Sequence, residues 1–121
     1  KNYTAANITF LHEDAYDFLV KNNKRFDVLI LAHVLEHLDN PKEFLNKYKV
    51  FFNYMYIEVP DFNKDILNTF REDLGSPYIY TDEDHINEFE RGQIKEIIES
   101  CGLTIEEARY TVGIQYLWIR C

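Results

Sequence analysis

The sequence predicts an α/β fold, and three observations carry this prediction. The run Val28-Leu29-Ile30-Leu31 is apolar without interruption, which is typical of a strand buried on both faces of a parallel sheet. Helical patterns precede and follow this run, as α/β folds require. Two short apolar runs near the end of the chain are separated by a turn around Gly113, which predicts a hairpin. We therefore expect a partial, mostly parallel sheet with a C-terminal antiparallel hairpin and helices on both faces.

The elements on either side of the central run follow from local patterns. Residues 7–11 (Asn-Ile-Thr-Phe-Leu) alternate β-branched and aromatic side chains, so we expect a strand there. A short helix is predicted next, and Asn22-Asn23 would end it. After the central run, Asn40 can cap a further helix and Pro41 can occupy its first position.

The second half of the chain is interpreted in the same way. Tyr54 to Val59 is expected to be a strand that Pro60 ends, because proline cannot donate to a sheet ladder. Residues 61–88 form the least regular region, and we expect a flexible loop at the ligand-binding end of the sheet. A helix is predicted from about Glu90 to Cys101, and Gly102 would stop it. The strands of the hairpin are expected at residues 104–110 and 115–120.

Length, charge and cysteine content limit the class of protein. The 121 residues, of which 46% are hydrophobic, suffice for one domain with its own core. The net charge of −8 disfavours contact with a phosphate backbone, so we expect no nucleic-acid partner. Cys101 and Cys121 lack the spacing of a disulfide framework or a zinc site, which fits a cytoplasmic protein. No apolar stretch approaches the roughly 20 residues that span a bilayer, so we expect no membrane partner.

The central run leads directly into His33-Val34-Leu35-Glu36-His37, which matches the H-x-x-E-H motif of one class of zinc metalloprotease. On an α-helix the two imidazoles would lie on one face and could share a zinc ion. The motif instead adjoins a predicted strand, and Asn40-Pro41 starts the next helix after it. We therefore predict a loop or single turn, fixed by hydrogen bonds of Glu36 and His37 to the backbone, and no metal ligands. A zinc-dependent hydrolase that uses His33 and His37 remains an alternative.

The run from Phe26 to Leu38, followed by Asp39-Asn40-Pro41 and Phe44-Leu45, resembles the fourth strand and following loop of class I S-adenosylmethionine-dependent methyltransferases. Two later segments are similar to the fifth strand with its exit and to the last helix with the segment before it. These are Ile57-Glu58-Val59-Pro60-Asp61-Phe62, and His85-Ile86-Asn87-Glu88-Phe89 with Ile94 to Gly102. The family's glycine-rich loop and the acidic residue after its second strand have no counterpart in this sequence. The resemblance therefore implies that residues 1–121 are a single partial domain, the carboxyl-terminal half of a Rossmann-like methyltransferase sheet.

The resemblance also implies which residues contact S-adenosylmethionine. Asp14 and Ala15 match the pair that holds the adenine, where the carboxylate accepts a hydrogen bond from the exocyclic amine. From the residues alone, Asp14 can equally be a helix cap. Ala32 and His33 match positions that line the methionine part of the cofactor, where a small side chain permits close approach.

The methyl acceptor is expected to be a small molecule, and we predict O-methylation. Displacement at a sulfonium depends mainly on positioning the acceptor, but a hydroxyl acceptor also needs a base. Histidine has a suitable pKa, so His85 is the candidate base and His33 is the reserve. The alternative for His85 is an exposed loop histidine that caps the next segment. Tyr78 and Tyr80, in the loop at 61–88, are candidates to shape the acceptor pocket.

A partial domain has two consequences. The cofactor site is incomplete, so we expect the chain to be inactive alone; a non-catalytic dimerisation or scaffold module is the alternative. The family places its first strands beside the run at 28–31, so the edge of that strand is left unpaired here. We predict that residues 7–11 move against this edge, or that two chains meet along it as a homodimer.

Overall fold

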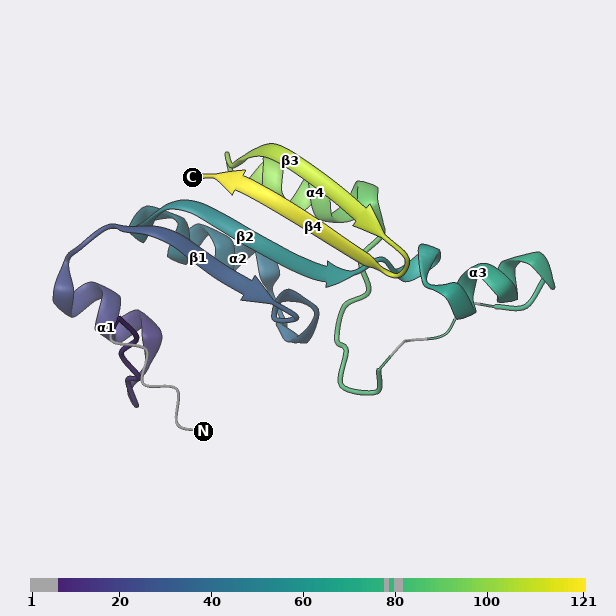
Figure 1. Cartoon of the computed structure of the whole chain (residues 1–121), viewed down its shortest axis with the longest axis horizontal. Helices are drawn as coiled ribbons and strands as arrows, with labels where there is room; N and C mark the ends of the chain where they lie inside the picture. The colour runs from purple at the N-terminus through teal and green to yellow at the C-terminus, as the bar shows by residue number, and fades with distance from the viewer. Residues whose placement is uncertain (1–6, 78, 80–81) are drawn as a thin grey trace.

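The computed structural model describes residues 7–77, 79 and 82–121 (Figure 1). The α-helices are α1 (Ala15–Asn22), α2 (Pro41–Tyr48), α3 (Ile66–Asp73) and α4 (Arg91–Ser100). The strands are β1 (Phe26–Ala32), β2 (Phe52–Pro60), β3 (Thr104–Thr111) and β4 (Ile114–Arg120). Short 3-10 helices occupy Leu35–His37, Lys49–Phe51 and Phe62–Lys64. None of the helices in the described part of the chain has the length and apolar character needed to cross a membrane.

The strands of the described residues form one mixed sheet in the order β1-β2-β4-β3. β1 and β2 are parallel, whereas β4 is antiparallel to both of its neighbours. β1, β2 and β3 therefore run in one direction and β4 in the other, and β3 and β4 form the predicted C-terminal hairpin (Figure 1). The α/β fold class is confirmed, with β1 at one edge of the sheet and β3 at the other.

The hydrophobic core lies between the sheet and the helices α2 and α4, which Figure 1 shows behind the strands. Leu31 of β1 pairs in register with Ile57 of β2, and Ile57 pairs with Leu117 of β4. All three side chains are buried, and burial of such apolar surface is the main term that stabilises the fold. The same cluster contains Leu35, Leu45, Met55, Val59, Phe89, Ile94, Ile98, Cys101, Leu103 and Ile119.

Helices cover one face of the sheet rather than the two faces predicted. In β1 the side chain of Ile30 is 67% exposed, although that of its neighbour Leu31 is buried. Figure 1 shows this face of β1, β2 and β4 open toward the viewer. The apolar run correctly predicted a strand, but burial on both faces needs a second layer, which the described residues do not supply.

The strand expected at residues 7–11 is not formed. The backbone there is turn and coil, and the side chain of Phe10 is 92% exposed. A strand needs a neighbour for its backbone N–H and C=O groups, and within the described residues β1 pairs with β2 alone. The prediction that this segment moves against β1 is therefore wrong, and that edge of the sheet stays open.

Local sequence explains where the first two helices begin and end. Asp14 caps α1, because its carboxylate accepts the N–H of the residue three positions later at 3.0 Å. Asn23, with a left-handed φ of 45°, ends the same helix. Asn40 caps α2 and Pro41 occupies its first position, as predicted.

The region at 61–88 contains α3 and a buried asparagine, Asn68, that organises it. The Nδ2 group of Asn68 donates to the carbonyl oxygens of Phe62 and Ile79, at 3.0 and 3.1 Å. Its Oδ1 accepts the N–H of Ile79 at 3.2 Å. These hydrogen bonds connect the chain before α3 with the chain after it. Figure 1 places α3 beyond the end of the sheet toward which β1 and β2 point.

Candidate functional site

Strand β1 ends in a sharp turn at His33. This residue has a φ of 52°, in the left-handed region that residues with a side chain rarely adopt. Its backbone N–H donates to the carbonyl oxygen of Glu58 in β2 at 3.0 Å, so the turn begins where the pairing of β1 and β2 ends. A left-handed residue with a Cβ costs about 1–2 kcal/mol. Such strain clusters at functional sites, which makes this turn a candidate.

The turn directs the His33 side chain between two carboxylates. Nδ1 lies 3.1 Å from Oε1 of Glu36, and Nε2 lies 3.2 Å from Oε1 of Glu58. Glu58 also accepts the hydroxyl of Tyr56 at 3.1 Å. Partial burial, followed by this hydrogen bond and the charge of Glu58, raises the pKa of Tyr56. A chain of polar groups therefore crosses the carboxyl ends of β1 and β2, and the His33 ring within it is 46% exposed.

A second group of polar side chains lies beside the first. Glu36, His37 and His85 each offer a potential metal-ligand atom, and these atoms lie within 4.8 Å of one another. The rings of His37 and His85 meet edge to face, with centroids 5.0 Å apart. The side chain of His85 is 7% exposed, and its Nδ1 lies 3.0 Å from Oε1 of Glu88. The alternative of an exposed loop histidine at this position is therefore wrong.

Backbone hydrogen bonds bring the segment before α4 to this place. The N–H groups of Ile86 and Asn87 both donate to the carbonyl oxygen of Glu36 at 2.9 Å. The Nδ2 group of Asn87 donates to the carbonyl oxygen of Leu38 at 2.6 Å. Residues far apart in the sequence thus meet at the carboxyl end of β1, where Figure 1 shows the returning chain beside the loop that follows this strand.

The H-x-x-E-H motif does not form the helix that a zinc protease requires. It spans the exit of β1 and the 3-10 helix Leu35–His37. His33 faces carboxylates, whereas Nδ1 of His37 lies 3.0 Å from the carbonyl oxygen of Asp84. His37 therefore fixes the loop through the backbone, as predicted, but the Glu36 side chain contacts His33 instead. This geometry does not join His33 and His37 on one zinc ion.

The other predicted cofactor residues lie on two separate elements. Ala32 is the exposed last residue of β1 and precedes His33 directly. Asp14 and Ala15 are exposed at the start of α1, where Asp14 has the capping role that the residues alone allowed. Tyr78 and Tyr80, proposed for the acceptor pocket, lie outside the described residues.

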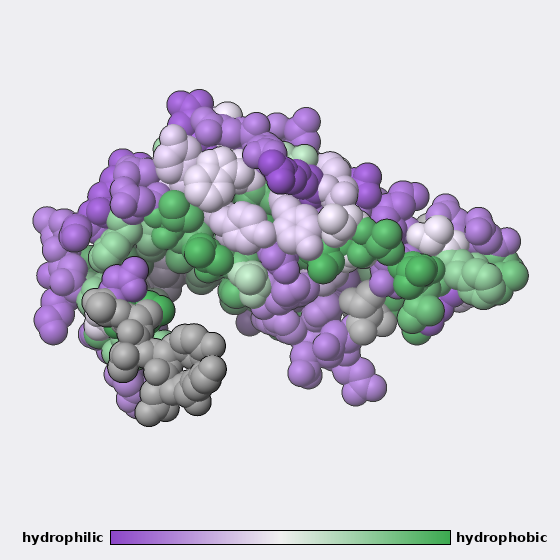
Figure 2. Space-filling model, viewed as in Figure 1, coloured by the Kyte–Doolittle hydropathy of each residue, from purple (hydrophilic) through white to green (hydrophobic). Residues whose placement is uncertain are grey.

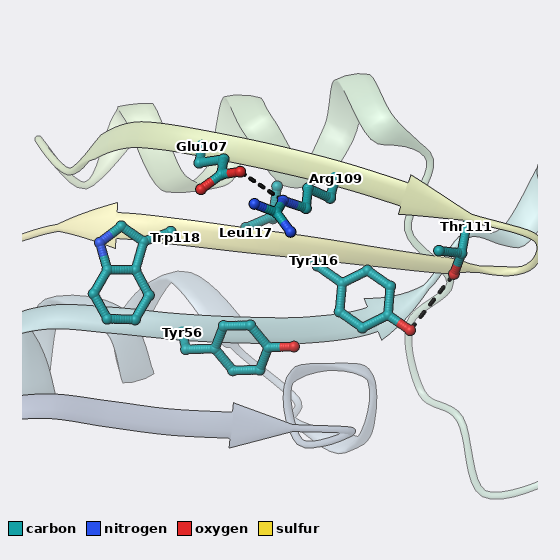
Figure 3. Close-up of a pocket in the computed structure, with 7 residues that line it drawn as sticks. All are labelled: Tyr56, Glu107, Arg109, Thr111, Tyr116, Leu117 and Trp118. Atoms are coloured by element: carbon teal, nitrogen blue, oxygen red, sulfur yellow. Dashed lines mark hydrogen bonds and ion pairs between the residues drawn. The ribbon is translucent and has the colours of Figure 1, made fainter.

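The open face of the sheet carries an aromatic groove that sequence reasoning missed. The groove has a volume of about 370 Å³, and Tyr56, Tyr116 and Trp118 project over it from β2 and β4 (Figure 3). Trp118 also stacks on Tyr54, with ring centroids 5.3 Å apart. Figure 2 shows a pale patch on this face, bordered by apolar side chains along β1. The alternating pattern of residues 114–119 could have predicted this groove, because it places aromatic side chains on one face of β4.

Comparison with known proteins gives a match to one protein family. A family model described as a methyltransferase domain matches residues 3–108. The crystal structure of the small RNA methyltransferase HEN1 is similar, with a TM-score of 0.64 over 83% of this chain and 18% sequence identity. None of the curated proteins matches the chain.

Two structures of the N-terminal domain of EvdMO1, one with SAH and D-fucose and one with SAH, also match. Each covers 82% of this chain, at 12% and 13% identity and TM-scores of 0.46 and 0.47. The chain spans 14% of the HEN1 chain and 48% and 47% of the two EvdMO1 chains. The likeness to HEN1 concerns the fold of this part of the protein.

Proposed function

Because the chain belongs to the methyltransferase domain family, we propose that it forms part of an enzyme that transfers the methyl group of S-adenosylmethionine to a small-molecule acceptor. The observation that carries this proposal is the polar chain at the carboxyl ends of β1 and β2, centred on the strained His33. Open α/β sheets bind their ligands at this edge. The half-exposed ring of His33 gives a ligand access to the polar groups.

The cofactor is proposed to extend from the exit of β1 to the start of α1. Ala32 is exposed and ends at Cβ, so the methionine part can approach the backbone closely. Asp14 is also exposed, and one of its oxygens accepts the N–H of Asp17. A carboxylate can accept further hydrogen bonds, including one from an exocyclic amine. Ala15 is the first residue of α1, so its N–H has no partner within the helix and can donate to a ring nitrogen.

A hydroxyl acceptor is proposed, and therefore O-methylation, because two candidate bases lie at this edge. The Nδ1 atom of His85 faces the Glu88 carboxylate at 3.0 Å, an arrangement that orients the imidazole for proton transfer. His33 is held between the carboxylates of Glu36 and Glu58 and is more exposed than His85. Because both ring nitrogens of His33 face carboxylate oxygens, His33 can accept a proton only after one of these contacts is released.

The charge of the chain favours a small molecule over RNA as the acceptor. HEN1 is a small RNA methyltransferase, but this chain has 13 Lys and Arg against 21 Asp and Glu. An excess of negative charge repels a phosphate backbone and releases no counterions on contact. The acceptor proposed here is therefore small and not a nucleic acid.

The chain is also proposed to be the carboxyl-terminal half of the catalytic domain and to be inactive alone. The open edge of β1 and the open aromatic face both lack the neighbours that the other half of such a sheet supplies. The same edge favours a second candidate, a non-catalytic module in which two copies pair along β1. Sedimentation equilibrium distinguishes these two candidate functions, since a chain that is monomeric at all concentrations argues against the dimerisation module.

Ala32→Leu is expected to weaken binding of S-adenosylhomocysteine by about tenfold or more, measured by calorimetry on the longer native chain. Three added carbons would occupy the space proposed for the methionine part, and tenfold corresponds to about 1.4 kcal/mol. Ala108→Leu makes the same change at an exposed position of β3 and should leave binding unaltered. Equal binding of S-adenosylhomocysteine by both variants would refute the placement of the cofactor. An absence of binding by the unmutated longer chain would refute the proposed function.

In the longer native chain, His33→Asn is expected to lower kcat by about 10²–10⁴-fold if His33 accepts the proton of the acceptor. Asparagine tolerates the left-handed backbone, so the variant should keep the turn. His12→Asn, at an exposed position outside the site, is the control and should leave kcat unchanged. An unchanged kcat for His33→Asn, together with a loss for His85→Asn, would assign the base to His85 instead.

A further inference from the structure

Three side chains at the carboxyl end of β1 offer potential ligand atoms that lie close together. A carboxylate oxygen of Glu36 and a ring nitrogen each of His37 and His85 lie within 4.8 Å of one another. From this geometry we propose a binding site for one divalent ion of a first-row transition metal. The proposal concerns cation binding alone and stands whether or not the chain binds S-adenosylmethionine. The sequence alone did not indicate this site, because His85 meets Glu36 and His37 only in the folded chain.

The two histidines are oriented as metal ligands usually are. The Nδ1 atom of His37 lies 3.0 Å from the carbonyl oxygen of Asp84. A carbonyl oxygen only accepts, so Nδ1 carries the proton and Nε2 carries the lone pair in the neutral ring. The Nδ1 atom of His85 lies 3.0 Å from the Glu88 carboxylate. Histidines that bind metals nearly always donate their other ring N–H to a carbonyl or carboxylate in this way.

Glu36 provides a second and independent observation. This side chain is completely buried, and its Oε1 lies 3.1 Å from Nδ1 of His33. Its Oε2 is also buried, and among the described residues it has no hydrogen-bond partner. An ionised oxygen without a partner is unfavourable inside a protein. A cation held with His37 and His85 would supply the missing partner, while His33 fixes the other oxygen.

The backbone contacts of this region do not explain the cluster by themselves. The N–H groups of Ile86 and Asn87 donate to the Glu36 carbonyl oxygen, which docks the segment carrying His85. These hydrogen bonds use main-chain atoms of Glu36, and its buried Oε2 still has no partner in the described part of the chain. Loop docking therefore accounts for the proximity of the residues but not for the unsatisfied carboxylate.

The ligand set indicates the class of ion. Two imidazoles and one carboxylate suit Zn²⁺, Co²⁺ or Fe²⁺, whereas Mg²⁺ and Ca²⁺ prefer oxygen ligands. Three protein ligands leave positions for water or another oxygen ligand, as in catalytic rather than structural sites. His37 is exposed, so these positions have access to solvent. With the ion bound, His85 serves as a ligand and not as the base of the proposed reaction.

Titration of the purified protein with Zn²⁺ by calorimetry and with Co²⁺ by visible absorption tests the proposal. We expect one ion per chain and an affinity for Zn²⁺ above that for Mg²⁺. His37→Gln should weaken Zn²⁺ binding by about tenfold or more and remove the Co²⁺ bands. The exposed position of His37 makes loss of the fold by this variant unexpected, and thermal unfolding verifies that it is folded.

His12→Gln removes an exposed histidine outside the cluster and should leave binding unchanged. Glu36→Gln keeps the shape of the buried side chain and should weaken binding as His37→Gln does. An adventitious ion only would bind equally well to His37→Gln or lose as much affinity with His12→Gln, and either result overturns the proposal. Such a failure would leave the proposed methyl transfer untouched, because neither measurement involves the cofactor.

Discussion

Ile57→Ala is expected to lower the free energy of unfolding by about 3–4 kcal/mol. Ile57 is fully buried in β2, the strand that lies between β1 and β4, and it pairs in register with Leu31 and Leu117. Truncation removes buried methyl groups and leaves a cavity that strands on both sides prevent from closing. Urea unfolding followed by the fluorescence of Trp118, the single tryptophan, measures the change.

Ile30→Ala is the matched control, because it removes the same atoms from a side chain of the same sheet that is 67% exposed. We expect a change within about 0.5 kcal/mol for this surface position. Equal losses for the two variants would contradict the open face of the sheet.

Arg91→Ala is expected to lower the free energy of unfolding by about 2–3 kcal/mol. Its guanidinium is the partner of Asp61, whose Oδ2 lies 2.8 Å from Nε and 2.7 Å from Nη2. Asp61 is fully buried, so loss of arginine leaves an unpaired charge inside the protein, which costs about 3–5 kcal/mol in fully buried pairs. Solvent reduces this figure here, because Arg91 is 43% exposed.

The control for this variant is Arg109→Ala, which removes an arginine from the exposed pair with Glu107 on β3. Exposed pairs contribute at most about 1 kcal/mol, so we expect a small shift of the melting temperature. The Asp61 N–H also donates to the carbonyl oxygen of Gly113, so Asp61 connects the end of β2 with the hairpin turn and α4. A melting temperature that falls equally in both variants would contradict a special role for the Asp61 pair.

Much of the fold could be predicted because its causes are local. The apolar run of β1, the proline that ends β2 and the Asn40-Pro41 start of α2 each act on neighbouring residues. Residues 7–11 satisfied the same local pattern and still formed no strand, because a strand depends on a partner that its own sequence cannot provide. The prediction that helices cover both faces of the sheet was wrong for the same reason, because a second layer also depends on partners outside the strand's own sequence.

The candidate site could be predicted only where it adjoins a predicted element. Ala32 and His33 were proposed because their segment resembles the fourth strand and following loop of class I methyltransferases, and β1 does end at Ala32. The approach of His85 depends instead on hydrogen bonds from the segment before α4 to the carbonyl oxygen of Glu36. The orientation of each side chain depends on partners distant in sequence, such as Glu58 for His33. Such tertiary contacts leave no periodic pattern in the sequence.

The left-handed backbone at His33 restricts which amino acids related proteins can carry there. Glycine, asparagine and aspartate adopt this conformation at little cost, whereas valine, isoleucine and threonine clash with their own main chain. The shape of the turn therefore limits this position to a short set of residues, which includes histidine.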